Sequence, residues 1–202
     1  EVISADLSSY EDCKRIVKDV DIVLNLAAWI RGAKEQQKSK IDLVRNNVVP
    51  SINILDAAVR EGVEYFGFVG SSTMYPDSHL PMKEEELFNG EPFKEYAGVG
   101  WMKRYCETLC DFFSNQIHDP MQCVIIRPSN AFGPNDKYDF EKCHVTPANI
   151  RKVADNLNPI PLWGDGTEVR DVIHVDDMVS GFICVAENVD EYDIYNVSYG
   201  KG

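Results

Sequence analysis

Short apolar runs alternate with longer amphipathic stretches along this chain of 202 residues. That alternation is typical of a parallel sheet whose strands are joined by helices. The run at 21–28 is apolar enough to predict a strand buried on both faces. Strands or strand ends are expected at 2–5, 21–28, 65–72, 123–128, 160–163 and 194–197.

Capping residues and the spacing of apolar positions predict the helices. Ser9 is a fitting N-cap with Glu11 and Asp12 in the first turn, and Gly62 is a fitting C-cap. Asp176 is expected to be an N-cap rather than a catalytic acid. Helices are expected from Ser9 to about residue 19 and at 38–61, 96–115, 145–156 and 176–187.

The alternation of strands and helices becomes less regular after Pro128, because 129–172 is richer in Pro, Gly, Asn and Asp. We expect two parts, 1–128 with regular α/β alternation and 129–202 with a smaller lobe whose last elements return to the sheet. The chain starts at Glu1 rather than Met, which favours an internal piece of a longer chain.

Composition narrows the function classes. A net charge of -13 argues against a protein that binds nucleic acid or anionic membrane, because like charges oppose that encounter. No apolar run approaches the roughly 18–20 residues that a membrane-spanning helix needs. The six cysteines show neither CxxC pairs nor metal-ligand spacing, so we expect reduced thiols, a cytoplasmic location and no metal site.

Several strings occur in the order found in one family. The chain resembles the extended short-chain dehydrogenase/reductases of the NAD-dependent epimerase/dehydratase family, closest in motifs to GDP-L-fucose synthase and related nucleotide-sugar epimerases. Each string is weak alone, and as a set they cover nearly the whole chain. The strings are ADL (5–7), NLAA (25–28), RNNV (45–48), SSTMYP (71–76), RPSNAFGP (127–134), HVTPANIRK (144–152), WGDGTEVRDVIHVDD (163–177) and YNVSYG (195–200).

The resemblance implies a doubly wound, Rossmann-type sheet that binds NAD or NADP across the carboxyl ends of its strands. In this family pattern 1–128 is the cofactor-binding part and 129–202 is the smaller substrate-binding lobe. Asp6 is placed to accept a hydrogen bond from adenine, unless it merely ends a strand. The glycine-rich turn that holds the pyrophosphate is missing, and with it the clue to NAD or NADP. The cofactor-binding residues implied are Asp6, Leu7, Leu26, Ala27, Ala28, Asn47, Ser71, Lys103, Pro128 and Asn130.

The resemblance also assigns catalytic positions. Ser71 matches the hydroxyl that binds the reacting oxygen of the substrate, although it also suits the end of a buried strand. Thr73 stands where fucose synthase has a cysteine paired with a histidine that matches His144. Because threonine does not titrate near neutral pH, a double epimerisation at C3 and C5 is in doubt. His144 is either a proton donor or a hydrogen-bonding group for the sugar.

The family pattern is Tyr, three residues and Lys, often followed by Glu four residues later, and two frames compete to place it in the helix at 95–107. If Tyr96 is the catalytic tyrosine, its partner is Gly100, which has no side chain to bind anything. If Lys103 and Glu107 set the frame, the tyrosine position holds Val99, and we favour this frame. Lys103 then lies one helical turn from a residue that has no proton to give. Tyr96, seven residues before Lys103, is a candidate to replace the missing tyrosine only if the start of the helix bends.

The residues expected to bind the substrate match the family pattern more closely than the catalytic residues do. Asn130 matches an asparagine, and Arg170 an arginine, that bind the diphosphate of the sugar nucleotide; Arg170 has the alternative of a salt bridge with Asp171. Trp163 is expected either to stack on the base or the sugar of the substrate or to pack in the core. The substrate-binding residues implied are Ser72, Asn130, His144, Val145, Trp163 and Arg170.

These residues predict an NAD(P)-dependent 4-epimerase or 4-keto reductase of a nucleoside-diphosphate sugar, with GDP favoured and activity in question because of Val99. The alternative is a non-catalytic homologue that binds the sugar nucleotide or the cofactor. A reductase of non-sugar ketones is disfavoured, because such a substrate has no diphosphate for Asn130 and Arg170. We expect a homodimer.

Overall fold

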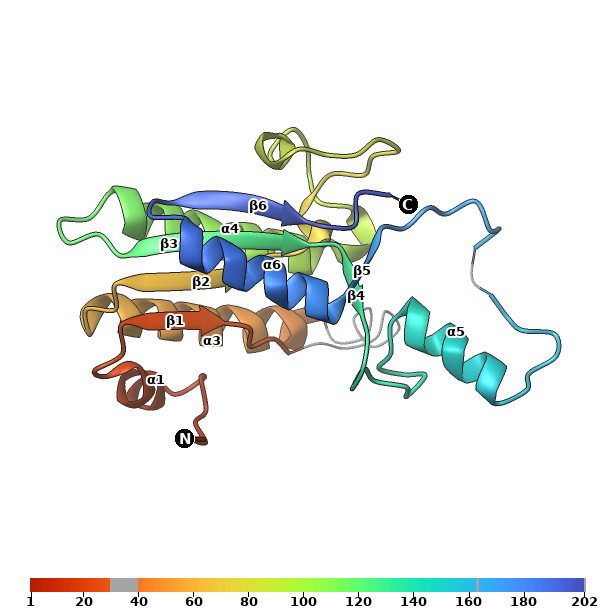
Figure 1. The fold of residues 1–202 in the computed structure, drawn as a ribbon, viewed down its shortest axis with the longest axis horizontal. Helices are drawn as coiled ribbons and strands as arrows, with labels where there is room; N and C mark the ends of the chain where they lie inside the picture. The colour runs from red at the N-terminus through yellow and green to blue at the C-terminus, as the bar shows by residue number, and fades with distance from the viewer. Residues whose placement is uncertain (30–39, 163, 202) are drawn as a thin grey trace.

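A computed structural model describes residues 1–29, 40–162 and 164–201. Four parallel strands form its central sheet in the order β1 (Ile22–Asn25), β2 (Tyr65–Val69), β3 (Gln122–Pro128) and β6 (Asp193–Val197). All four strands point the same way in Figure 1, so their carboxyl ends share one edge. The expected α/β class with a parallel sheet is confirmed.

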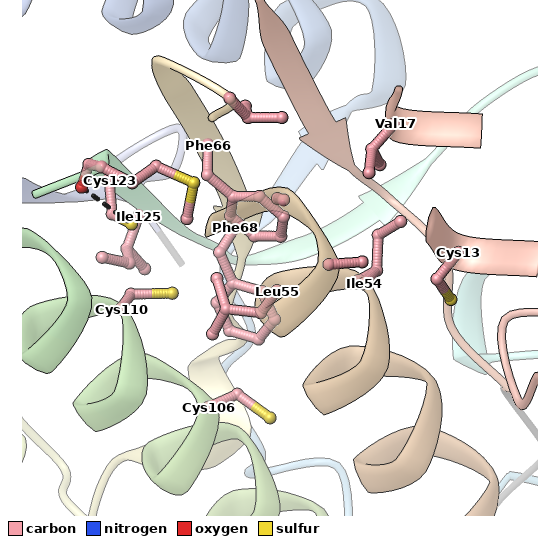
Figure 2. Close-up of a cluster of buried hydrophobic side chains, with 14 residues drawn as sticks. Cys13, Val17, Ile54, Leu55, Phe66, Phe68, Cys106, Cys110, Cys123 and Ile125 are labelled. Carbon is pink, nitrogen blue, oxygen red and sulfur yellow. Dashed lines mark hydrogen bonds between the residues drawn. The ribbon is translucent and has the colours of Figure 1, made fainter. Parts of the chain in front are cut away.

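Helices lie on both faces of the sheet (Figure 1). One face is covered by α3 (Lys40–Arg60) and α4 (Ala97–Asn115), and α1 (Tyr10–Val17) packs against α3. The other face is crossed by α6 (Val175–Asn188). The main core fills the space between the sheet and α3 and α4, where Figure 2 shows Phe66, Phe68 and Ile125 facing Leu55 and Cys110.

Strand β2 shows why the two faces differ. Phe66 and Phe68 point into the main core, so Gly67 between them faces α6. A Cβ atom at Gly67 would lie 2.6 Å from Phe182 Cζ and 2.7 Å from Leu24 Cδ2. Only glycine lets Phe182 of α6 approach the sheet this closely.

Shorter elements occupy the loops at the carboxyl edge. Three 3₁₀ turns follow β2, namely η1 (Ser72–Met74), η2 (Glu84–Glu86) and η3 (Lys94–Tyr96). A separate parallel pair consists of β4 (Asn130–Phe132) and β5 (Val172–His174), and α5 (Val145–Ala154) lies in the connection between them. The sequence did not predict β4 or β5.

The expected caps are confirmed at two helices and wrong at a third. Ser9 Oγ accepts a hydrogen bond from Asp12 N at the start of α1, and Gly62, with φ of 76°, follows α3. At α6 the cap is His174, whose Nδ1 accepts from Asp176 N at 3.3 Å. Asp176 lies inside the first turn, where its negative charge interacts favourably with the helix dipole.

Two strand predictions are wrong and two are too long. The strand expected at 65–72 ends at Val69. Residues 2–5 form no strand, because they have no neighbouring strand among the described residues and Val2 is fully exposed. β1 ends at Asn25, and its Ile22 is 59% exposed, because α6 leaves one face of this edge strand uncovered. Residues 160–162 are irregular and exposed, and residue 163 lies outside the described part.

The segment after residue 128 contributes both to the main sheet, through β6 and α6, and to the β4–β5 pair. A separate smaller lobe therefore stays a prediction. All six cysteines are free thiols. None of the helices in the described ranges is both long and apolar enough to cross a membrane.

Candidate active site at the carboxyl edge of the sheet

The carboxyl ends of the parallel strands bring distant parts of the sequence to one edge. The registers pair Asn25 with Phe68, Val69 with Ile126, and Pro128 with Val197. The residues that follow each strand are the ones that the family resemblance singles out. In Figure 1 this edge faces β4, β5 and α5.

Ser71 and Thr73 lie in a tight turn directly after β2. Ser71 caps η1, and its Oγ accepts hydrogen bonds from Thr73 N at 3.2 Å and from Thr73 Oγ1 at 2.9 Å. Gly70 N donates to Ile126 O at 2.7 Å, which anchors the start of the turn to β3. The two hydroxyl groups therefore form one linked pair, while Ser72 beside them is exposed.

Lys103 reaches the same place from helix α4. Its Nζ donates a 2.6 Å hydrogen bond to Val69 O, the last residue of β2, and lies 5.4 Å from the centre of the Phe68 ring. Burial of the ammonium group lowers the pKa of Lys103 from 10.5 to about 8. A lysine with this pKa exchanges protons close to neutral pH.

The packing of α4 explains why position 100 holds a glycine. A Cβ atom there would lie 2.5 Å from Pro92 Cβ and 2.7 Å from Thr73 O, so no side chain fits at position 100. A lysine partner four residues after Tyr96 is thereby excluded. Tyr96 belongs to η3 and caps α4, with its ring 6.1 Å from that of Phe93. Val99 and Lys103 lie one turn apart in α4, as the favoured frame requires, and the assignment of the tyrosine position to Val99 stays a prediction.

The residues expected to hold the adenosine half of the cofactor have clear local roles. Asp6 Oδ1 accepts a hydrogen bond from Ser8 N at 2.9 Å, and hydrogen bonds from Ser8 lower the pKa of Asp6. Leu7 O accepts from Asn53 Nδ2 at 3.1 Å, which ties this segment to α3. Cofactor binding by Asp6 and Leu7 stays a prediction.

The segment after β1 is held open to solvent by two asparagines. Leu26, Ala27 and Ala28 are exposed, and Asn25 Oδ1 accepts from Ala27 N at 3.2 Å. Asn47 is buried, and its Oδ1 accepts a hydrogen bond from Trp29 N at 2.8 Å. Its Nδ2 donates to Trp29 O at 3.0 Å and to Leu43 O at 2.8 Å. Asn47 thus shapes the NLAA segment, and direct contact between Asn47 and a cofactor stays a prediction.

Pairing of β4 with β5 brings Asn130 beside Asp171, the residue that follows Arg170. Asn130 follows the buried Pro128, and its Nδ2 donates to Asp171 O at 3.2 Å. Asp171 accepts instead from Tyr199 N at 3.1 Å and Gly200 N at 2.7 Å. Arg170 is exposed and forms no ion pair within the described ranges, so the alternative of a salt bridge with Asp171 finds no support.

The remaining substrate residues are not drawn together. His144 caps α5 and, like Val145, is exposed. No hydrogen bond recorded for the described residues joins His144 to Thr73. Trp163 lies outside the described residues. The roles of Ser72, His144, Val145 and Trp163 toward substrate stay predictions.

A buried polar network beside the Ser71 turn was missed by sequence analysis. Arg127 and Glu107 form a two-bond ion pair, at 2.6 and 2.9 Å, with side chains only 1% and 4% exposed. Arg127 Nη1 also donates to Tyr75 Oη at 2.6 Å, and Tyr75 Oη donates to Asn196 Oδ1 at 2.7 Å. The pattern that ends in Glu107 was the one available signal, and it did not reveal the partners.

The edge fits one half of a dinucleotide. Lys103, Ser71 and the small residues of the NLAA segment surround the ends of β1 and β2, which suits a nicotinamide and its ribose. No GxxGxxG string occurs in the 202 residues, so a pyrophosphate-binding turn of that kind is not present in this chain. Contact between these residues and a nicotinamide stays a prediction.

Comparison with known proteins agrees with the geometry. The family model described as "NAD dependent epimerase/dehydratase family" matches residues 1–198. GDP-L-fucose synthase of Escherichia coli is 32% identical over 184 residues, covering 88% of this chain and 56% of that protein. The GDP-L-fucose synthase of Sinorhizobium fredii is 28% identical over 204 residues, covering 96% and 64%. This chain therefore spans 56–64% of the length of these two relatives.

Solved structures share the fold. A GDP-L-fucose synthetase from Naegleria fowleri, bound to NADP, superposes with a TM-score of 0.84 at 22% identity, covering 96% of this chain and 65% of that chain. A UDP-N-acetylglucosamine 4-epimerase from Methanobrevibacter ruminantium superposes with a TM-score of 0.84 at 26% identity, covering 98% and 61%. The resemblance inferred from the motifs is confirmed.

Proposed function

Since the chain belongs to the NAD dependent epimerase/dehydratase family, we propose that it acts with NAD or NADP on C4 of a nucleoside-diphosphate sugar, as a 4-epimerase or 4-keto reductase. The names of the similar proteins, GDP-L-fucose synthase and GDP-mannose 3,5-epimerase, favour GDP as the nucleotide. The observation that carries the proposal is Lys103, whose ammonium group is bonded to Val69 O at the end of β2, two residues before Ser71.

The residues of the chain divide the work. A bound nicotinamide supplies hydride transfer to or from C4. Ser71, whose Oγ is already linked to Thr73, binds the reacting oxygen, and Lys103 holds the nicotinamide ribose. Asn130 and Arg170 bind the diphosphate, for which the planar guanidinium of Arg170 offers paired donors.

Val99 is the weak point of this arrangement. A tyrosine at this position, one turn from Lys103, would exchange a proton with the sugar oxygen, and valine has none to exchange. Loss of general acid–base catalysis costs a factor of about 100 to 10,000 in rate and leaves binding groups in place. We therefore propose a site that still binds its ligands and has lost most of its catalytic rate. The alternative function, a non-catalytic sugar-nucleotide or cofactor binding homologue, rests on the same residue.

Restoring the hydroxyl tests both versions. The wild-type chain, Val99→Tyr and Val99→Phe are titrated with GDP-mannose and UDP-glucose by calorimetry. Nicotinamide absorbance at 340 nm is then followed with each sugar nucleotide and excess NAD⁺ or NADP⁺. C4 epimers are measured by chromatography in the same reactions, because an epimerase returns the hydride to C4 and leaves no net change in absorbance. Val99→Phe is the matched control, because it adds the ring without the hydroxyl.

We expect all three proteins to bind GDP-mannose and only Val99→Tyr to change the absorbance or to form a C4 epimer. If the sugar nucleotides bind and Val99→Tyr stays inert, the non-catalytic version holds for these sugars. If neither sugar nucleotide binds the wild-type chain, both versions are wrong for them.

We also propose a homodimer and a cytoplasmic location. The outward faces of α3 and α4 leave large apolar side chains exposed, and an isologous interface would pair this surface with itself. These side chains are Ile41, Val49, Trp101, Tyr105 and Phe112. The free thiols of all six cysteines suit a reducing compartment.

A further inference from the structure

The ion pair of Glu107 and Arg127 lies where an apolar contact would also have served. Removing two charges from water is costly, and apolar pairs of similar volume are often as stable as buried ion pairs or more so. The chain nevertheless uses both oxygens of Glu107 and three nitrogens of Arg127 here, with Arg127 Nη1 also donating to Glu84 O at 2.9 Å. Such a fully bonded cluster specifies one arrangement of the elements that it joins.

The elements joined are the ones that carry the proposed catalytic groups. Glu107 lies one turn after Lys103 on α4, and Tyr75 directly follows the η1 turn that Ser71 caps. Arg127, near the end of β3, bridges Glu107 to Tyr75. The network therefore runs from the Lys103 helix to the Ser71 turn.

Two further contacts hold the same turn. Tyr75 Oη donates to Asn196 of β6, and Asn196 Nδ2 in turn donates to Met82 O at 3.1 Å. From α4, Arg104 Nε donates to Met74 O at 2.7 Å and Nη1 to Gly90 O at 2.8 Å. Residues of α4, β3 and β6 thus hold the Ser71 turn in place by hydrogen bonds.

We infer that Tyr75, Arg127 and Glu107 are positioning residues, which fix the Ser71 turn against α4 and so hold the Ser71 hydroxyl and the Lys103 ammonium group in one arrangement. This inference rests on the proposed function for the roles of Ser71 and Lys103. The network itself, and its effect on Lys103, are open to measurement whether or not the chain turns over a sugar nucleotide.

The pKa of Lys103 depends on how closely the Ser71 turn packs against α4. The groups that face it are Cys106 on its own helix, and the Phe68 ring and Val69 carbonyl on β2. No carboxylate contributes to its lowered pKa, and burial is the main cause. Loosening the turn admits water to the ammonium group, so the pKa of Lys103 should rise from about 8 toward 10.5.

Removal of one hydroxyl group tests the inference. Tyr75→Phe deletes the acceptor of Arg127 and the donor to Asn196 and keeps the ring. Tyr65→Phe is the matched control, because Tyr65 is 7% exposed, Tyr75 is 8% exposed, and the buried Tyr65 hydroxyl has no hydrogen-bond partner in the described structure. The pKa of Lys103 is measured by NMR on ¹³C-methylated lysines, with Lys103→Arg identifying the signal.

We expect the pKa of Lys103 to rise by at least about 1 in Tyr75→Phe and to stay unchanged in Tyr65→Phe, with unaltered far-UV circular dichroism in both. A merely structural role would lower stability without moving this pKa in the folded protein. If the pKa stays near its wild-type value in folded Tyr75→Phe, the inference is overturned.

A second variant covers a Tyr75→Phe protein that fails to fold. Asn196→Ala removes the far partner of the Tyr75 hydroxyl and leaves the Glu107–Arg127 pair intact. A rise in the pKa of Lys103 again supports the inference, and an unchanged pKa overturns it. Calorimetry of the wild-type chain with GDP-mannose is scored separately, so that failure of the proposed function is not mistaken for failure of the positioning role.

Discussion

At the scale of single residues, Lys103 destabilises the fold in which it is placed. Its folded pKa of about 8 lies below the ordinary 10.5, so folding below pH 8 carries a buried charge at a cost of at most about 3 kcal/mol. Lys103→Met removes that cost and also loses the hydrogen bond to Val69 O, worth about 1 kcal/mol. We expect Lys103→Met to raise the free energy of unfolding at pH 7 by about 1–2 kcal/mol.

The sign of the pH dependence follows from proton linkage. Between pH 8 and 10.5 the unfolded chain binds more protons at residue 103 than the folded chain, so wild-type stability rises with pH in that window. The advantage of Lys103→Met should therefore shrink from pH 8 to pH 10.5 in urea denaturation. Lys94→Met, at an exposed position, is the control and should show no such trend. A constant advantage across the window would contradict the burial of the Lys103 charge.

Sequence analysis found the residues whose spacing along one element carries the signal. Lys103 and Val99 were identified because their positions, four residues apart in one helix, determine their proximity. Arg127 and Glu107 meet across two elements, and Tyr75 reaches Asn196 across 121 positions of sequence. No local pattern encodes such distances, so the positioning network was not predictable from the sequence.

At the scale of elements, the contact between α4 and the Ser71 turn depends on Gly100. Alanine at this position forces its Cβ within 2.5 Å of Pro92 and 2.7 Å of Thr73 O, so the helix or the turn must shift. We expect Gly100→Ala to lower the free energy of unfolding by about 1–3 kcal/mol, the usual cost of overpacking. Urea denaturation provides the measurement.

Gly98 offers a matched control on the same helix. A Cβ atom there meets only Val44 Cγ2, at 3.6 Å, an ordinary contact. Gly98→Ala should therefore raise stability by up to about 1 kcal/mol through helix propensity. Equal effects of the two substitutions would contradict the close packing at Gly100.

Element length decided which elements the sequence could predict. α3 and α4 span 21 and 19 residues, enough turns for the apolar period to show. β4 and β5 have three residues each, too few for any period, and they form only because each finds the other. Residues 2–5 illustrate the converse, because apolar side chains without a neighbouring strand do not make one.

At the scale of the whole molecule, the parallel order of the sheet followed from the alternation of strands and helices. That order explains why the candidate site gathers residues from 26 to 130 at one edge. The side of the molecule away from the sheet was not predictable in the same way. Whether an apolar helix face meets a neighbour depends on the tertiary arrangement, and α3 and α4 each turn one apolar face to the sheet and leave other apolar residues outside.

The proposed dimer is tested on that outer surface. Tyr105, which is exposed on α4 near the exposed Trp101, is changed to lysine. At an isologous interface each substitution occurs twice, so Tyr105→Lys buries two unpaired charges and should convert the dimer to monomer at micromolar concentration in sedimentation velocity. Tyr199→Lys, which changes an exposed tyrosine beyond the end of β6, should leave the dimer intact. A wild-type chain that sediments as a monomer would exclude the homodimer, and a dimer that survives Tyr105→Lys would place the interface on another surface.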